Sequence, residues 1–139
     1  MMWIVYALLS AGFAAAVAIF GKLGLKDVDT TVATTIRAVV MAVFLLIATG
    51  VLQKFALIKT VGNQALTFII FSGVAGALSW LFYFLAIKHG PVTGVAALDR
   101  LSVVFVVILA AIFLGEALTA KSVTGLVFLV IGALLLVFK

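Results

Sequence analysis

Cysteine is absent from this 139-residue sequence, which also contains a single proline and a single histidine. A chain without cysteine cannot form a disulfide, a thiolate metal site or a cysteine nucleophile. His89 alone cannot build a multi-histidine metal cluster, so the sequence predicts no metal site and no cofactor. The sequence also lacks a phosphate-binding loop and a dinucleotide-binding fingerprint, which excludes nucleotide-driven chemistry in this chain.

The chain offers no convincing set of catalytic residues. His89 is separated from Asp99 by a segment that includes Pro91, and a loop histidine beside Lys88 is typically solvated. A hydrolase built from His89, Asp99 and Ser102 is therefore not expected. We predict that the protein is not an enzyme.

Charge is also scarce: 9% of the residues are charged and 68% are hydrophobic, with a mean hydropathy of +1.51. These values lie far outside the range of soluble domains, so lipid must be the main surroundings of the chain. The net charge of +5 comes from basic residues scattered singly between apolar runs, so no nucleic-acid-binding patch is expected. The uncharged run from Met1 to Gly21 is too long for a cleavable signal core and is better explained as a first helix.

Long apolar runs fill the rest of the chain, and the charged residues fall mostly where helices should end. The runs are long enough to span a bilayer as helices, which need about 20 residues, and they do not alternate in polarity as membrane strands do. Thr30 and Thr31 suit the N-cap of the second helix, whereas Gly90-Pro91 and Gly115-Glu116 should end the third and fourth. The sequence predicts a single all-α integral membrane domain, residues 1–139, with five transmembrane helices at about 2–21, 30–52, 64–87, 92–114 and 119–138.

The loops show no charge bias that would orient the chain. Five spans place the termini on opposite sides, and each side then carries four positive groups: the N-terminal amine, Lys54, Lys59 and Lys121 against Lys22, Lys26, Lys88 and Lys139. Positively charged loops normally stay in the cytoplasm, so a balanced chain is expected to insert in both directions and form an antiparallel homodimer. The alternative is that Asp27 and Glu116, or finer local effects, still set one orientation.

Three charged residues fall inside the predicted spans. Arg37 lies about eight residues into the second helix, roughly 12 Å deep, and Asp99 and Arg100 lie at a similar depth in the fourth. Charges at this depth cost at least ~2.5 kcal/mol and usually face a bundle interior or an aqueous cavity. We predict that all three contact substrate, Asp99 pairing with Arg37 or a cation and an arginine binding a carboxylate or phosphate. The alternative is a structural ion pair, with Arg100 reaching the interface.

Gly73, Gly76, Trp80 and Tyr83 recur at three- and four-residue spacing and so share one face of the third helix. Small residues beside aromatic ones leave a hollow. One interpretation makes Trp80 and Tyr83 the wall of a substrate cavity, with Ser79 near its edge. The other is close helix packing against the two glycines.

The last helix carries a second pair of small residues. Gly125 and Gly132 stand seven positions apart and share a face. This spacing suits a helix contact, either at the dimer seam or within one chain. Glu116, just before this helix, is expected to satisfy amides at its start.

Several motifs occur in order along the chain: Lys22 to Asp29, Ala33-Thr34, Arg37, Ser79 to Phe84, Lys88, Gly90 to Val92, Leu98 to Ser102 and Phe113 to Thr119. Together they resemble half-size EamA-type proteins of the drug/metabolite transporter superfamily. The similarity covers essentially the whole chain, with one small departure, Arg100, where lysine is at least as common. Small multidrug resistance proteins are a weaker match, because the run from Met1 to Gly21 lacks their acidic residue.

The resemblance implies half of an inverted-repeat, ten-helix transporter, completed by an inverted second copy. The implied function is secondary, alternating-access transport of small organic metabolites across the cell (plasma or inner) membrane. The intramembrane charges sum to one positive charge per chain, which favours an anionic or zwitterionic solute. Two alternatives remain open: a non-transporting membrane partner subunit, and a component of a lipid-headgroup flippase.

Overall fold

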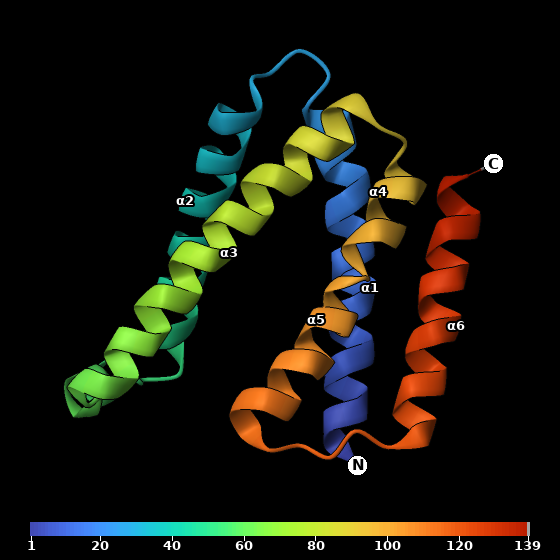
Figure 1. Ribbon diagram of the computed structural model, residues 1–139. Helices are drawn as coiled ribbons and strands as arrows, with labels where there is room; N and C mark the ends of the chain where they lie inside the picture. Colours follow the sequence, from blue (N-terminus) through green and yellow to red (C-terminus); the bar gives the residue numbers. More distant parts are fainter. Residues whose placement is uncertain (139) are drawn as a thin grey trace. The chain divides into compact units, whose positions relative to one another are not determined.

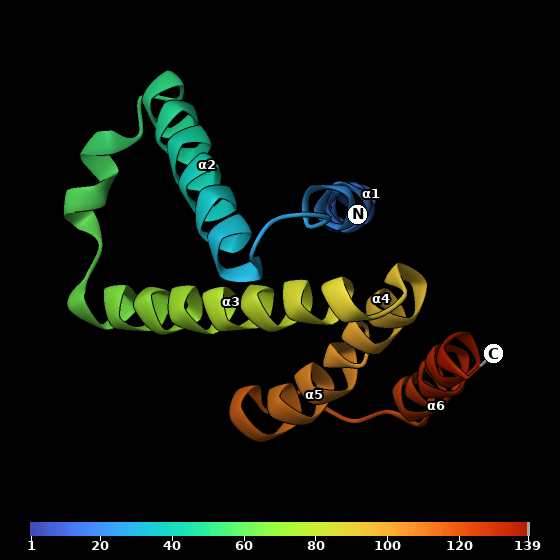
Figure 2. The same ribbon diagram turned by 90° about the horizontal axis from the view of Figure 1, so that it is seen from above.

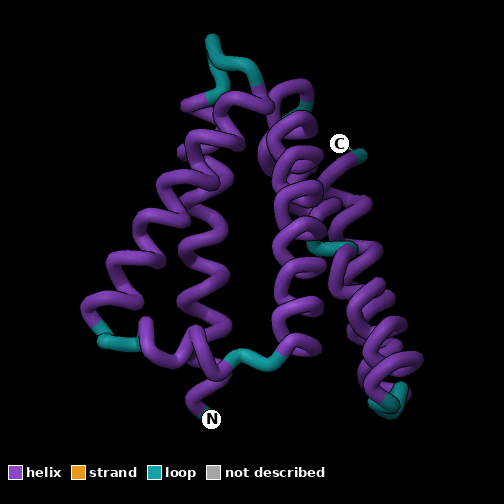
Figure 3. The backbone as a smooth tube through the Cα atoms, turned by 90° about the vertical axis from the view of Figure 1, so that its left-hand side faces the viewer, coloured by secondary structure: helices purple, strands orange, loops and turns teal. Residues whose placement is uncertain are grey.

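The computed structural model describes residues 1–138, and this part of the chain consists of helices and connecting loops without strands (Figures 1 and 3). Five stretches are long and apolar enough to cross a membrane: Met2–Gly24, Thr30–Val51, Asn63–His89, Val92–Leu114 and Ala120–Val137. The predicted all-α fold with five membrane helices is therefore confirmed. The elements are α1 (Met2–Gly24), α2 (Thr30–Val51), η1 (Phe55–Thr60), α3 (Asn63–His89), α4 (Val92–Asp99), α5 (Ser102–Leu109), η2 (Ala110–Leu114) and α6 (Ala120–Val137).

The fourth span runs from Val92 to Leu114, as predicted, but its α-helix is interrupted near the middle, between α4 and α5. The Leu101 amide donates to the carbonyl of Leu98, 2.9 Å away, and the Val104 amide donates to Leu101 at the same distance. These bonds link residues three apart, as in a 3₁₀ turn, so the α-helical ladder tightens between Asp99 and Ser102. No glycine or proline lies at this point, so the sequence carries no signal of the interruption.

Side chains other than the expected ones cap two of the helices. The Asp29 carboxylate accepts hydrogen bonds from the amides of Thr31 and Val32, at 2.8 and 3.2 Å, so Asp29 rather than either threonine is the N-cap of α2. The Thr119 hydroxyl accepts from the Ser122 amide at 3.1 Å. Thr119 therefore caps α6, the role that had been expected of Glu116. Both caps satisfy amides that have no partner inside the helix.

Gly115 ends the fourth span, as its sequence predicts. Its φ of +69° lies in the left-handed region, and its amide donates to the carbonyl of Ala110 across the η2 turn. Residues with a Cβ atom pay a steric penalty in this conformation, so glycine suits the position.

The chain divides into two compact units. The first comprises residues 1–20 and 89–139 and contains most of α1 with α4, α5, η2 and α6. Within it, α4 packs along α6, and the described ends of the chain lie at opposite ends of the helices (Figure 1). The buried residues of this unit are all glycine or alanine: Ala18, Gly94, Ala97, Ala110 and Ala133. Small residues let helix backbones approach closely, which is the usual basis of helix association in lipid.

The second unit comprises residues 21–88. In this unit α2 and α3 lie close together near the start of α2 and separate toward η1 (Figure 2). Two lysines tie the last turn of α1 and the α1–α2 connection to the end of α3. The ammonium of Lys22 in α1 donates to the carbonyl of Ile87, and that of Lys88 donates to the carbonyl of Val28 at 2.8 Å. The closed end of the α2–α3 wedge is therefore fixed by polar contacts as well as by packing.

Candidate functional site

The candidate site centres on Arg37, at the start of the third turn of α2. Its guanidinium carbon Cζ lies 3.5 Å from the ring centroid of Trp80 and 5.6 Å from that of Phe84, both on α3. A cation over an aromatic face is attracted by the negative face of the ring, and the attraction grows when water is excluded. The arginine and the tryptophan that the sequence singled out separately are therefore in direct contact.

Trp80, Tyr83 and Phe84 form an aromatic cluster around this contact. Trp80 and Tyr83 meet edge to face, with centroids 5.4 Å apart and planes at 78°, and Trp80 and Phe84 are 5.9 Å apart at 62°. Edge-to-face geometry is the favoured arrangement of aromatic pairs. These contacts hold the Trp80 ring at a defined angle beneath Arg37.

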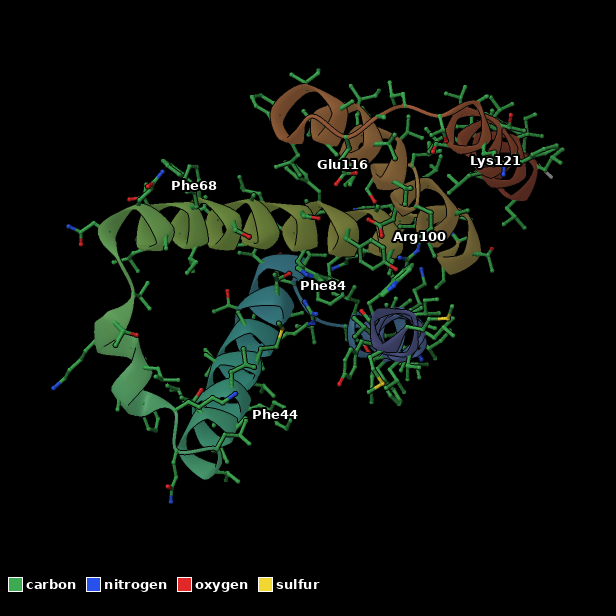
Figure 4. All side chains as sticks on the ribbon, turned by 90° about the horizontal axis from the view of Figure 1, so that it is seen from below. Phe44, Phe68, Phe84, Arg100, Glu116 and Lys121 are labelled. Carbon is green, nitrogen blue, oxygen red and sulfur yellow. The ribbon has the colours of Figure 1, made fainter. Side chains whose placement is uncertain are left out.

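Phe84 is a member of the site that sequence reasoning missed. It lies where α2 meets α3 (Figure 4), it is 3% exposed, and its ring faces Gly21 at the end of α1. A Cβ atom added at Gly21 would lie 2.7 Å from Cε1 of Phe84. The available signal was spacing, because Phe84 follows Trp80 by four residues and so shares its helix face.

The electrostatic surroundings of Arg37 within its own unit are aromatic rather than acidic. From Thr30 to Lys88 the sequence contains no aspartate or glutamate. The two carboxylates of the unit, Asp27 and Asp29, precede α2, and Asp29 is occupied with the amides at the start of that helix. Within residues 21–88, all of which the structure describes, the guanidinium group of Arg37 contacts aromatic rings and donates to no hydrogen-bond acceptor.

The capping role of Asp29 also affects its titration. Hydrogen bonds from the amides of Val32 and Thr31 favour the ionised form, so the pKa of the Asp29 carboxyl lies below its usual value of 3.8. Asp29 is therefore a negative charge at the start of α2, which complements the helix dipole.

The other predicted substrate residues are more exposed. Ser79 is exposed on α3 beside Trp80, while Asp99 and Arg100 are exposed in the other unit, where α4 ends. Arg100 has the backbone angles of the tightened turn, φ −66° and ψ −15°. The pairing of Asp99 with Arg37 and the contacts of all three residues with substrate stay predictions.

The four glycines predicted to mediate packing lie on open helix surface. An added Cβ atom at Gly73, Gly76, Gly125 or Gly132 would meet no other side chain within 4 Å in the described part of the chain. Their packing within this chain is thus not seen, and their role at a dimer seam stays a prediction. Gly94, which had not been singled out, does contact a neighbouring helix, with Val137 3.8 Å from its ideal Cβ position.

Comparison with known proteins identifies the family. A model of the EamA-like transporter family matches residues 1–138, nearly the whole chain. The chain belongs to the EamA-like transporter family. Membership in this family and the five apolar helices make it a multi-pass protein of the cell membrane.

Two relatives of this EamA-like protein have names that refer to transport. A protein of Sinorhizobium sp. named "Uncharacterized transporter in cobO 3'region" is 42% identical over 137 residues, which cover 96% of this chain and 95% of the relative. "Pseudopaline exporter CntI" of Pseudomonas aeruginosa is 34% identical over 99 residues, or 68% of this chain but 35% of the exporter. No solved structure matches the chain. The family and these names support a membrane transporter.

Proposed function

We propose that this EamA-like protein transports small organic solutes across the cell membrane as an antiparallel homodimer, by alternating access. The observation that carries the proposal is the stack of Arg37 on Trp80 inside two membrane spans. A charge held in the membrane span and contacted by rings instead of a carboxylate of its own unit is costly, and charges kept there despite this cost usually mark a substrate or ion pathway. Binding of a solute during each transport cycle would account for this charge.

Two further observations support the homodimer. The chain matches the full length of one relative but about a third of a larger exporter, so transport in this family is compatible with chains of very different length. The exposed apolar surface is also extensive: at most 6% of the residues in the most apolar window of each candidate span are buried within the chain. A second copy would cover part of that surface, and the balanced loop charges allow it to insert inverted.

Purified protein reconstituted in liposomes tests the function. We expect uptake or release of one or more small organic solutes that saturates with concentration, and loss of that flux in Arg37→Ala. Gly12→Ala, at a glycine with no predicted role and with open space around its added Cβ in the described chain, serves as a folded control for the substitution itself. A well-folded dimer that moves no solute would support a non-transporting partner subunit, and movement of labelled lipids alone would support a flippase.

Dual insertion has its own test. Reporter fusions placed at the C-terminus, one active in the cytoplasm and one active outside it, should both give signal in the same cells. Signal from one reporter alone would rule out an antiparallel pair built from this chain only.

A further inference from the structure

The contact between Arg37 and Trp80 determines which part of the guanidinium group remains accessible. A Cζ atom 3.5 Å from the ring centroid leaves no room for an N–H group pointing at the ring, so the guanidinium lies flat on the indole. The stacked face is covered by Trp80. The five N–H donors of a guanidinium lie in its plane, and they therefore point along the ring surface rather than into it.

These donors are unused within the unit. No acceptor in residues 21–88, all described, takes a hydrogen bond from Arg37. Arg37 is also half-buried, and in the described chain no buried side-chain nitrogen or oxygen lacks a partner. The donor edge must therefore be open to the surroundings and not sealed by packing. Inside a membrane span, N–H donors that lack an acceptor strongly favour binding of a ligand that carries oxygen acceptors.

The charge of the ligand follows from the few cations close to Arg37 in its unit. The ammonium of Lys22, at the end of α1, is held against the Ile87 carbonyl. Arg37 is the only charged residue of α2, and Lys88 near the end of α3 is the only other charge on the two helices. Lys88 is held against the Val28 carbonyl. One guanidinium neutralises a monoanion, whereas a doubly charged phosphate would leave an uncompensated charge in a low-dielectric site. A planar carboxylate also matches the two parallel donors of a guanidinium edge.

We infer that the Arg37–Trp80 stack binds the carboxylate of an organic acid, with the apolar part of that solute against the Trp80 and Tyr83 rings. This inference rests on the proposed transport function, because it names the class of solute that the same site would carry. Trp80 acts as a positioning residue: its ring holds the guanidinium flat and leaves the donor edge facing the ligand.

The chain allows a direct optical test, because Trp3 and Trp80 are its only tryptophans. In a Trp3→Phe background Trp80 is the sole indole, and its fluorescence reports on the site. The protein would be placed in nanodiscs of phosphatidylcholine and titrated with four probes of similar size: benzoate, benzamide, benzyltrimethylammonium and phenyl phosphate. Arg37→Gln in the same background is the matched variant, since it keeps a polar side chain but removes the positive charge and the paired N–H donors of the guanidinium group.

We expect a saturable change in Trp80 fluorescence with benzoate. Benzamide should bind at least about tenfold more weakly, the loss expected for charge-assisted hydrogen bonds, and benzyltrimethylammonium should give no saturable change. Arg37→Gln should reduce benzoate affinity to that of benzamide. The inference is overturned if benzamide equals benzoate, if phenyl phosphate or the cation binds more tightly, if Arg37→Gln changes nothing, or if no probe saturates.

Two further experiments identify the source of the carboxylate and distinguish a failure of this inference from a failure of the proposed function. Competition by phosphatidylserine in the nanodiscs would show that the site takes a lipid carboxylate and would overturn the assignment to a solute. In liposomes, benzoate binding without any solute flux would refute transport while leaving the carboxylate site intact. Solute flux that survives Arg37→Gln would refute the carboxylate site while leaving transport intact.

Discussion

Replacing Gly21 with alanine tests whether the aromatic cluster is packed as described. The new Cβ atom would lie 2.7 Å from Cε1 of Phe84, whereas ordinary van der Waals contact begins near 3.4 Å. One of the two groups must therefore move by about 0.7 Å. Phe84 has little freedom to do so, because its ring is 3% exposed and packs against Trp80.

The size of the effect follows from two opposing contributions. Overpacking of this kind costs about 1–3 kcal/mol, while alanine gains about 1 kcal/mol over glycine through helix propensity. We expect Gly21→Ala to lower the free energy of unfolding by about 1 kcal/mol. Gly12→Ala is the matched control in the same helix, with nothing within 4 Å of its added Cβ in the described chain, and it should gain up to about 1 kcal/mol.

Unfolding would be followed by circular dichroism during SDS titration of protein in mixed micelles. Phe84→Leu should relieve the clash, so the double variant should be more stable than the two single effects predict when added. In the Trp3→Phe background, Gly21→Ala should also shift the emission of Trp80, because a displaced Phe84 ring changes its surroundings. If Gly21→Ala matches Gly12→Ala in stability and leaves Trp80 emission unchanged, Phe84 does not pack against Gly21 and the cluster geometry is wrong.

Three further predictions concern helix ends. Amides that bind the ionised form lower the pKa of Asp29, so its contribution to the free energy of unfolding is complete above pH 3.8 and is lost as the pH falls through the lower pKa of the folded state. In Asp29→Asn, the free energy of unfolding should therefore lose this decrease at acidic pH. Gly115→Ala should cost about 1–2 kcal/mol in SDS unfolding because of its positive φ, and Gly115→Asn less; equal stability of the two would contradict a left-handed cap. Thr119→Ala should cost about 1 kcal/mol in the same assay, whereas Thr119→Ser should be nearly neutral.

The five spans could be predicted from the sequence because their signal is length and composition, which depend on no contact. The end of the fourth span could be predicted equally well, because a glycine readily adopts the left-handed backbone conformation that ends a helix, as Gly115 does. The residues that cap the helices could not be predicted with the same precision. Asp29 and Thr30 stand side by side, and which of them caps α2 depends on where the first helical turn begins.

Features that depend on contacts between distant segments were harder to predict. The sequence placed Arg37 and Trp80 in the right region but could not bring them together, because their contact depends on how α2 meets α3. Phe84 was missed for a related reason: its importance comes from Gly21, more than sixty residues away. The tightened turn at Leu101 follows no glycine, proline or cap, and we have no physical account of its position.

The contact between α4 and α6 has a consequence for how this chain can change. At Gly94, Ala97 and Ala133 the fold requires a small side chain and makes no further chemical demand. Lipid-facing positions nearby can exchange one large apolar residue for another, but a side chain of valine size or larger at any of these three would push the two helices apart, whereas a single methyl group at Gly94 makes ordinary contacts. Sequence variation within functional versions of this protein should therefore be limited there by volume, with glycine, alanine and serine interchangeable and valine or leucine excluded.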